Sequence, residues 1–207
     1  MNPTRVFTGC LLAALCAMVP VAVASEPARA TASAREVVDS LEQALIESMK
    51  QGPSLTLAQR KEQLAPVIDR ALDFSRMARF IFGANWREMS EADRTAFLEA
   101  FRELSVTTYA ARFDVHKGER FDSASEAAQG GERILVRSRF TKGGGDKVAF
   151  DYLMMRSGGE WRIVNILTDG ISDLALKRSQ YGGLYGREGM AAVLANIGNQ
   201  TRRLHEE

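Results

Sequence analysis

The chain has 207 residues, and its 27 Lys and Arg against 26 Asp and Glu give a formal net charge of +1. A nearly neutral chain is a poor candidate for nucleic-acid binding, because that binding depends on an excess of basic residues that neutralise phosphates. Hydrophobic residues make up 45% of the chain, which is enough to bury the core of one domain.

The N-terminus has the features of a secretory signal peptide. Arg5 precedes an apolar run that ends in Ala22-Val23-Ala24, a typical cleavage motif. Pro20 interrupts the run, which is shorter than the about 20 residues that a membrane anchor needs. The sequence therefore predicts a signal peptide over 1–24, a flexible leader over 25–34 and a single domain over 35–207.

Apolar residues recur at helical spacing in the first part of this domain. They predict a helix over Arg35–Lys50, closed by Gly52-Pro53. Thr56, with Gln59 three residues later, is typical of a capping box and predicts the start of a second helix. We expect Pro66 to end or kink that second helix, because proline lacks the backbone donor.

The central stretch, Asp73–Ala110, predicts two amphipathic helices joined by a break at Gly83–Met89. Ser90, three residues before Asp93, marks the start of the second helix. The apolar faces comprise Phe74, Met77, Ala78, Ile81 and Phe82 in the first helix and Phe97, Phe101, Leu104 and Thr108 in the second.

After Phe113 the hydrophobic period changes from about 3.6 to 2, and glycine pairs and triplets separate the segments. This pattern predicts four antiparallel strands in a meander. If Lys142 faces Asp146 and Ser157 faces Glu160, one sheet face receives the following cross-strand pairs: Phe140 with Val148, Val136 with Tyr152, Ile134 with Met154, Met154 with Ile163, and Phe150 with Leu167.

The last part of the chain predicts two further helices. Asp169–Asp173 ends the fourth strand and caps a helix over Leu174–Tyr181, and a final helix runs from Glu188 to Arg203. The expected fold is therefore α+β: helices packed on one face of a curved four-stranded antiparallel sheet, with an apolar cavity between the two layers.

The central stretch reads DFSRMARFIFGANWREMSEADRTAFLEAFRELSVTTYA and resembles the signature of the MlaC family, also called the toluene-tolerance family. Glu160-Trp161, Gly170-Ile171-Ser172 and Tyr181-Gly182 continue the resemblance through the second half. It implies a periplasmic carrier that holds a membrane lipid by its tails and moves it between the inner and outer membranes. Phospholipid is the default cargo. The segment DGISDLALKRSQY is more similar to the hopanoid-associated HpnM branch, which makes a hopanoid the alternative cargo.

The resemblance also implies partners, and no cofactor beyond the bound lipid. In the family the inner-membrane partner is an MCE-domain protein of an ABC transporter, whereas an RND-type exporter takes this place in the hopanoid branch. A lipid donor or acceptor complex in the outer membrane completes the route.

Combining the predicted inward faces with the resemblance gives a set of candidate lipid-binding residues, for each of which ordinary core packing is the alternative. We expect Arg79, Arg87 and Lys177 to lie at the rim, where they contact a headgroup or a partner. The predicted cavity lining consists of Phe74, Met77, Ile81, Phe101, Tyr109, Val136, Phe150, Tyr152, Ile163, Leu167 and Ile171.

The sequence offers little support for an enzyme. It has no G-x-S-x-G elbow, P-loop or HExxH motif, and both cysteines, Cys10 and Cys16, fall in the signal peptide, so neither a nucleophile elbow nor a zinc site is expected. One alternative is a steroid-isomerase-like enzyme that uses Tyr152, Asn165 and Ser138 in an apolar pocket, but no carboxylate or histidine is predicted on that sheet face to act as the base. The other alternative is a periplasmic adapter with a solid interior and no ligand.

Overall fold

The computed structural model describes Met1 and residues 32–206. Apart from Met1, the predicted signal peptide lies outside these residues, as does most of the predicted leader. The elements are α1 (Ala34–Gln51), the 3₁₀ turn η1 (Gly52–Ser54), α2 (Leu57–Ala71), α3 (Phe74–Phe82), α4 (Asn85–Glu88), α5 (Glu91–Arg112), β1 (Arg120–Ala128), β2 (Arg133–Thr141), β3 (Lys147–Ser157), β4 (Glu160–Thr168), β5 (Ile171–Ser172), α6 (Asp173–Lys177), the π-helical turn η2 (Arg178–Gly182) and α7 (Gly183–Glu206).

The first two helices begin at capping boxes. In α1 the Ser33 hydroxyl accepts from the Glu36 backbone N–H while the Glu36 carboxylate accepts from the Ser33 N–H, and Thr56 and Gln59 make the same reciprocal bonds at α2. Pro66 does not end the second helix, because α2 continues through it to Ala71. Pro66 lies on the exposed face, where water can satisfy the helix carbonyl that loses its donor.

The central stretch forms the predicted pair of helices. Asp73 caps α3 by accepting from the Arg76 N–H, and Gly83 ends it with a φ of 58°, a conformation that favours glycine. The short α4 fills the predicted break. Ser90 then caps α5 by accepting from the Asp93 N–H at 3.0 Å.

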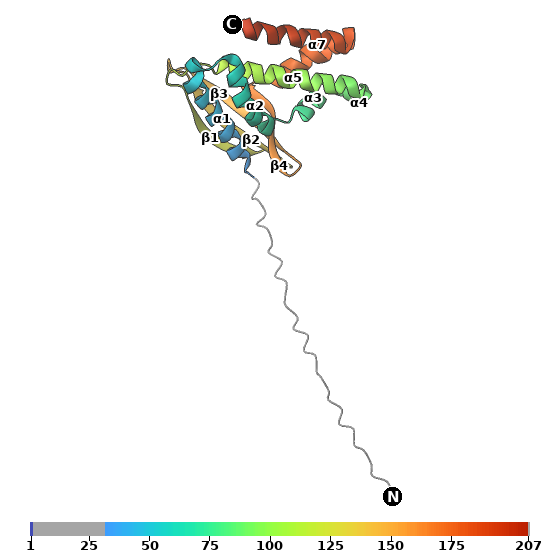
Figure 1. The fold of residues 1–207 in the computed structure, drawn as a ribbon, viewed down its shortest axis with the longest axis horizontal. Coiled ribbons are helices and arrows are strands. Elements are labelled where there is room, and N and C mark those ends of the chain that lie inside the picture. The colour runs from blue at the N-terminus through green and yellow to red at the C-terminus, as the bar shows by residue number, and fades with distance from the viewer. Residues whose placement is uncertain (2–31, 207) are drawn as a thin grey trace. The chain divides into compact units, whose positions relative to one another are not determined.

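The strands form one antiparallel meander in the order β1-β2-β3-β4-β5. The four predicted strands are present, and the two-residue β5 is an additional fifth strand. The predicted pairs Phe140–Val148, Val136–Tyr152, Ile134–Met154 and Met154–Ile163 are confirmed. The predicted α+β class, with helices packed against an antiparallel sheet, is likewise confirmed (Figure 1).

The predicted pair Phe150–Leu167 is wrong, because β4 contains a bulge. Met154 pairs with Ile163 but Leu153 pairs with Asn165, so Val164 has no partner in β3. Beyond this extra residue every β4 side chain points to the face opposite to the predicted one. Phe150 therefore pairs with Thr168, Ile166 faces the helices, and Leu167 lies across from Asp151 on the other face.

The helices form a layered cover over the sheet. α1 packs against β1, β2 and β4, α2 packs against β4, and α7 runs along α5 on the side away from the sheet (Figure 1). One continuous core joins these layers. Its largest fully buried side chains are Val38, Leu41, Leu45, Leu64, Ile68, Ile81, Phe97, Phe101, Met154, Ile163, Tyr181 and Ile197.

The C-terminal part differs in detail from the prediction. The helix expected over Leu174–Tyr181 begins at Asp173 and changes to π-helical geometry at Arg178. α7 then starts at Gly183 and contains a non-helical residue, Gly189, with a φ of 79°. The regular part of α7 begins beyond Gly189, close to the predicted start at Glu188.

Candidate functional site

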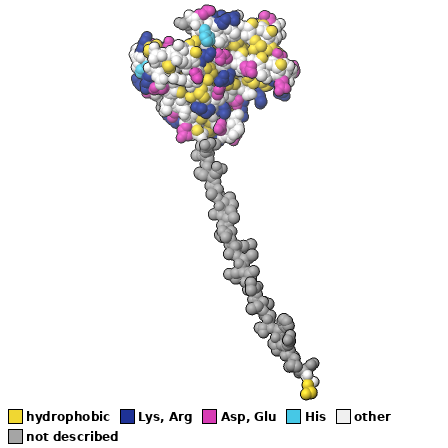
Figure 2. Space-filling view, in the orientation of Figure 1, with side chains coloured by type: hydrophobic (Ala, Val, Ile, Leu, Met, Phe, Trp, Pro, Cys, Tyr) yellow, Lys and Arg dark blue, Asp and Glu magenta, His cyan; other side chains and the backbone are white. Residues whose placement is uncertain are grey.

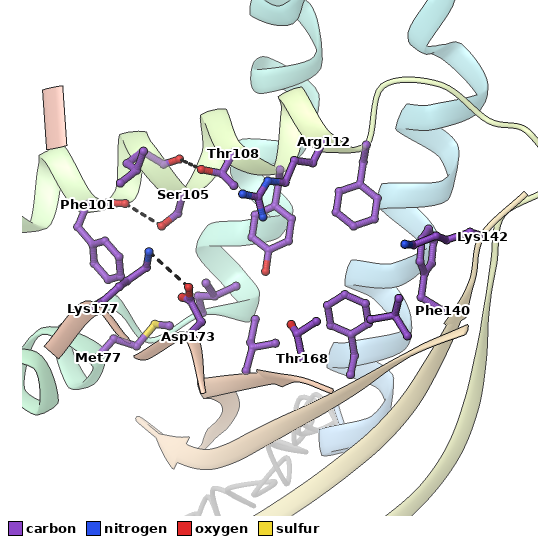
Figure 3. A pocket seen from close by; sticks show the side chains of 17 residues that line it. Met77, Phe101, Ser105, Thr108, Arg112, Phe140, Lys142, Thr168, Asp173 and Lys177 are labelled. Carbon is purple, nitrogen blue, oxygen red and sulfur yellow. Dashed lines mark hydrogen bonds and ion pairs between the residues drawn. The ribbon is translucent and has the colours of Figure 1, made fainter. Parts of the chain in front are cut away.

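A cavity of about 340 Å³ lies between α5, α6 and the helix-facing side of the sheet (Figure 3). Most of its wall is apolar, and its charged side chains are Arg112, Lys142, Asp173 and Lys177. The complete lining is Leu72, Met77, Phe101, Leu104, Ser105, Thr108, Tyr109, Arg112, Phe113, Phe140, Lys142, Val148, Phe150, Ile166, Thr168, Asp173 and Lys177.

One stripe of α5 supplies the helical wall. Phe101, Ser105, Thr108 and Arg112 follow one another at spacings of three or four residues, which places them on the same side of the helix. The Ser105 hydroxyl donates to the Phe101 carbonyl and the Thr108 hydroxyl to the Leu104 carbonyl, each at 2.7 Å. These hydroxyls are therefore satisfied within the helix and add little unpaired polarity to the wall.

Aromatic rings close one end of the cavity. Phe113 lies 6.0 Å from Tyr109 and 5.8 Å from Phe140, measured between ring centroids. Phe121 lies 4.7 Å from Phe140 and 5.9 Å from Phe150. We call these five rings the aromatic end wall; Tyr152 lies behind it, 6.2 Å from Phe150. Stacked and edge-to-face contacts of this kind are favourable beyond their buried area.

The bulge in β4 determines the sheet side of the wall. Because Val164 shifts the register, Ile166 and Thr168 lie on the cavity side together with Phe150 and Val148. The predicted lining residue Leu167 is consequently on the opposite face, which corrects that assignment.

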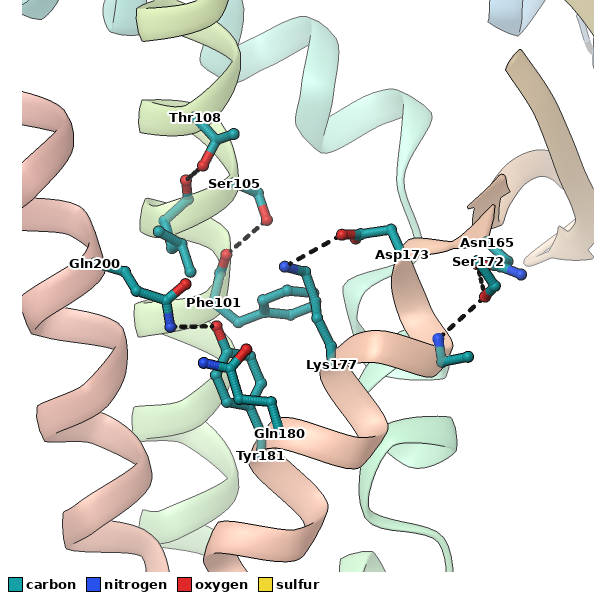
Figure 4. Close-up of polar contacts among 12 residues, drawn as sticks. Phe101, Ser105, Thr108, Asn165, Ser172, Asp173, Lys177, Gln180, Tyr181 and Gln200 are labelled. Carbon is teal, nitrogen blue, oxygen red and sulfur yellow. Dashed lines mark hydrogen bonds and ion pairs between the residues drawn. The ribbon is translucent and has the colours of Figure 1, made fainter. Parts of the chain in front are cut away.

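Cationic groups lie at the mouth. Lys177 Nζ is 3.5 Å from Asp173 Oδ1 and lies 5.8 Å from the centroid of the Phe101 ring (Figure 4). Its side chain is only 20% exposed, so this ion pair is partly shielded from water. Ser172 positions α6 by accepting from the Ala175 N–H and donating to the Asn165 side chain, both at 3.0 Å.

The structure separates the predicted lining residues into wall and core. Met77, Phe101, Tyr109 and Phe150 lie on the cavity wall, and Lys177 belongs to the same lining. Ile81, Val136 and Ile163 are at most 1% exposed in the core, Tyr152 is buried behind the Phe150 ring, and Phe74 packs edge-to-face on Phe101 at 5.7 Å.

Three other predicted site residues do not reach the wall. Ile171 is 60% exposed, because it pairs with Thr168 in the short β5 and its side chain points to solvent. Arg79 and Arg87 are exposed on α3 and α4 and do not line the cavity. The prediction missed Arg112, although continuing the α5 stripe one turn beyond Thr108 leads to it.

A buried carboxyl lies on the helix-facing side of the sheet, where none was predicted. Glu42 of α1 is 3% exposed, and its carboxyl is close to the hydroxyls of Ser138 and Tyr152. Glu42 Oε1 and Ser138 Oγ have no hydrogen-bond partner within the described part of the chain. Burial raises the pKa of Glu42 from 4.5 to about 7, against the opposing effect of the two hydroxyls.

This arrangement does not form the isomerase-like site that was considered as an alternative. Tyr152 pairs with Ile166, and Asn165 pairs with Leu153, so the predicted neighbours Tyr152 and Asn165 lie on opposite faces. Glu42 does not line the cavity, and the one carboxylate among the described lining residues, Asp173, is paired with Lys177. A carboxylate held this way is poorly suited to act as a general base on a bound molecule.

Residues 32–206 contain no group of three or more His, Asp or Glu side chains placed to hold a metal ion. None of the helices in the same range is both long and apolar enough to cross a bilayer.

The fold and cavity define a class: a small α+β protein whose sheet and helices enclose an apolar, ligand-sized space with a cationic mouth. The sequence pattern of the MlaC protein family matches residues 39–199, and the chain belongs to the MlaC family. The predicted family membership is thereby confirmed. The fold is also similar to that of a phospholipid-binding protein from Ralstonia solanacearum, solved in complex with a phospholipid. The two share 20% identity and a TM-score of 0.74, over 84% of this chain and 99% of the other.

Proposed function

We propose that the protein is a periplasmic lipid carrier that moves a membrane lipid, by default a phospholipid, between the inner and outer membranes. The observation that carries this proposal is the apolar cavity between α5 and the sheet, opening at cationic side chains. Membership of the MlaC family and the phospholipid in the similar Ralstonia structure support the same conclusion.

The physical need for such a carrier follows from the cost of exposing acyl chains to water. Each methylene transferred out of water contributes about 0.8 kcal/mol, so a sixteen-carbon tail corresponds to about 13 kcal/mol. A protein that covers the tail removes most of this cost during transfer. This task requires no catalytic group, and we propose that the protein is not an enzyme.

We propose that Met77, Phe101, Tyr109 and Phe150 contact the tails. The volume of about 340 Å³ is near the lower end of the range of about 300–1,000 Å³ for small-molecule sites. A lipid with two long tails therefore requires the aromatic end wall to move aside. Because its rings contact one another in a chain, displacing Phe113 or Phe140 would open space toward Phe121.

The chain must exchange cargo with membrane components. We propose an MCE-domain protein of an inner-membrane ABC transporter as one partner and an outer-membrane lipid complex as the other, with an RND-type exporter replacing the transporter if the cargo is a hopanoid.

Mass spectrometry of lipids extracted from the purified protein tests the proposal. We expect a co-purified phospholipid, or uptake of phospholipid from vesicles in a stoichiometry of about one per chain. A hopanoid that displaces a fluorescent phospholipid at equimolar concentration would favour the hopanoid cargo. Failure to retain or accept any lipid would contradict the carrier function.

A further inference from the structure

A second hollow, of about 230 Å³, adjoins the cavity between α5, α6 and α7. It shares Leu104, Thr108, Arg112, Asp173 and Lys177 with the cavity and adds Gln200, Arg203 and Leu204 from the last turns of α7. We call it the α7 groove. The shared residues make it a lateral extension of the cavity mouth, and its composition is predominantly polar, in contrast to the cavity.

The α7 groove has an excess of positive charge. Arg112, Lys177 and Arg203 line it, against the single carboxylate of Asp173, which is 3.5 Å from Lys177. Neither Arg112 nor Arg203 makes an ion pair with an acidic side chain of the described chain. In a protein with a formal net charge of only +1, this is a local concentration of uncompensated cations.

The opposite side of the mouth is different. The hollow beside the β2–β3 hairpin also includes Arg112, together with Lys117 and Lys142, but there Asp114 and Glu119 offset the positive charge. Glu119 is further held by accepting from the Lys117 and Gly143 backbone N–H groups. An anionic group at the mouth therefore meets a larger excess of positive charge, and is more strongly attracted, on the α7 side.

Arginine suits the recognition of phosphate oxygens, because its planar guanidinium can donate two parallel hydrogen bonds. Figure 3 shows the Arg112 side chain beside Thr108 at the edge of the cavity, so a group bound there stays within reach of tails inside. Figure 2 shows apolar, basic and acidic side chains intermixed over the face of the molecule in that view.

We propose that the α7 groove is a headgroup subsite, in which Arg112 and Arg203 bind the phosphate of a lipid with a net negative headgroup while its tails occupy the cavity. A zwitterionic headgroup places a cationic amine among these cations and binds less well. This inference rests on the proposed carrier function and specifies the class of cargo.

The test compares phosphatidylglycerol with phosphatidylethanolamine carrying the same acyl chains, in displacement of a fluorescent lipid from the purified protein. We expect the wild type to prefer phosphatidylglycerol. We expect Arg203→Gln to weaken phosphatidylglycerol binding about tenfold, as for the loss of one charge-assisted hydrogen bond, and to leave phosphatidylethanolamine nearly unchanged. The preference should also fall between 50 mM and 500 mM salt, because the groove is open to solvent.

Arg202→Gln is the matched control. Arg202 is the adjacent exposed arginine of α7, donates to Asn199 and does not line the groove. Arg202→Gln removes one positive charge, as Arg203→Gln does, and this variant should keep the wild-type preference for phosphatidylglycerol. Equal binding of both lipids by the wild type, or equal effects of the two variants, would overturn the subsite while leaving the carrier function intact.

Glycerol 3-phosphate, which has the anionic group without tails, tests whether the groove binds a lipid headgroup or a free phosphate compound. We expect it to compete only weakly with phosphatidylglycerol. Competition as strong as that of the intact lipid would identify the groove as a site for free phosphate compounds and overturn the headgroup assignment. If no lipid of either kind binds, the proposed function itself fails.

Discussion

Replacing Glu42 by Gln should make the stability of the protein less dependent on pH. The Glu42 carboxyl loses its proton near pH 4.5 when the chain is unfolded, but only near pH 7 when it is buried between α1 and the sheet. Between these values the folded state holds a proton that the unfolded state has released, so the free energy of unfolding falls as the pH rises from 4.5 to 7. Gln cannot ionise, so the free energy of unfolding of the Glu42→Gln variant should not fall in this way between pH 4.5 and pH 7.

The magnitude follows from the same two pKa values. The difference between 4.5 and about 7 corresponds to about 3 kcal/mol, at about 1.36 kcal/mol for each pKa unit. We therefore expect Glu42→Gln to gain about 2–3 kcal/mol relative to the wild type between pH 5 and pH 8. Urea unfolding at both pH values measures this difference directly.

Glu47→Gln provides the control for this measurement. Glu47 is on the same helix but is largely exposed beside Lys50, so its replacement should leave the pH dependence of stability as in the wild type. Parallel stability curves for the wild type and Glu42→Gln would refute the reasoning, because they would mean that the buried carboxyl does not titrate in this range.

Two further pairs of variants test the cavity and the packing of α1. Phe150→Asp should abolish phospholipid uptake with a modest fall in Tm, because Phe150 lies on the cavity wall. Val136 is 1% exposed in the core, so Val136→Asp should unfold the protein. An equal loss of stability in the two variants would place Phe150 in the core. Gly52→Ala should cost more than about 3 kcal/mol in urea unfolding, because its Cβ would lie 1.4 Å from the Asp114 carbonyl oxygen. Gly144→Ala, which has open space, should have little effect, and a small effect of both would contradict the close approach at Gly52.

The parts of the fold that depend on local rules were predictable from the sequence. Ser33 and Thr56 cap their helices through neighbours three residues away, and the glycine-containing turns at 143–145 and 158–159 set the hairpin registers as expected. Each of these features involves only a few residues, and those residues are close together in the sequence. The same applies to Phe101 and Thr108, which helical spacing alone placed on one face of α5.

Features that depend on distant contacts were not predictable. The bulge at Val164 adds a single residue without any glycine to mark it, and it reverses the faces of Ile166 and Leu167. Glu42 looks like one more polar residue of an amphipathic helix, and only the packing of α1 on the sheet buries it, beside Ser138 and Tyr152. Wall and core residues have the same apolar chemistry, so Phe150 and Val136 cannot be distinguished before the layers are assembled.

The bulge in β4 divides the strand into one half that packs in the core and one half that borders the cavity. Ile163, before Val164, belongs to the core, whereas Ile166 and Thr168, after it, border the cavity. Deleting Val164 would restore a continuous alternation and bring Leu167 to the inner side in place of its two neighbours. The interior volume of this protein can thus be reshaped by the loss of one codon, while the two hairpins that hold the strand keep their own sequences.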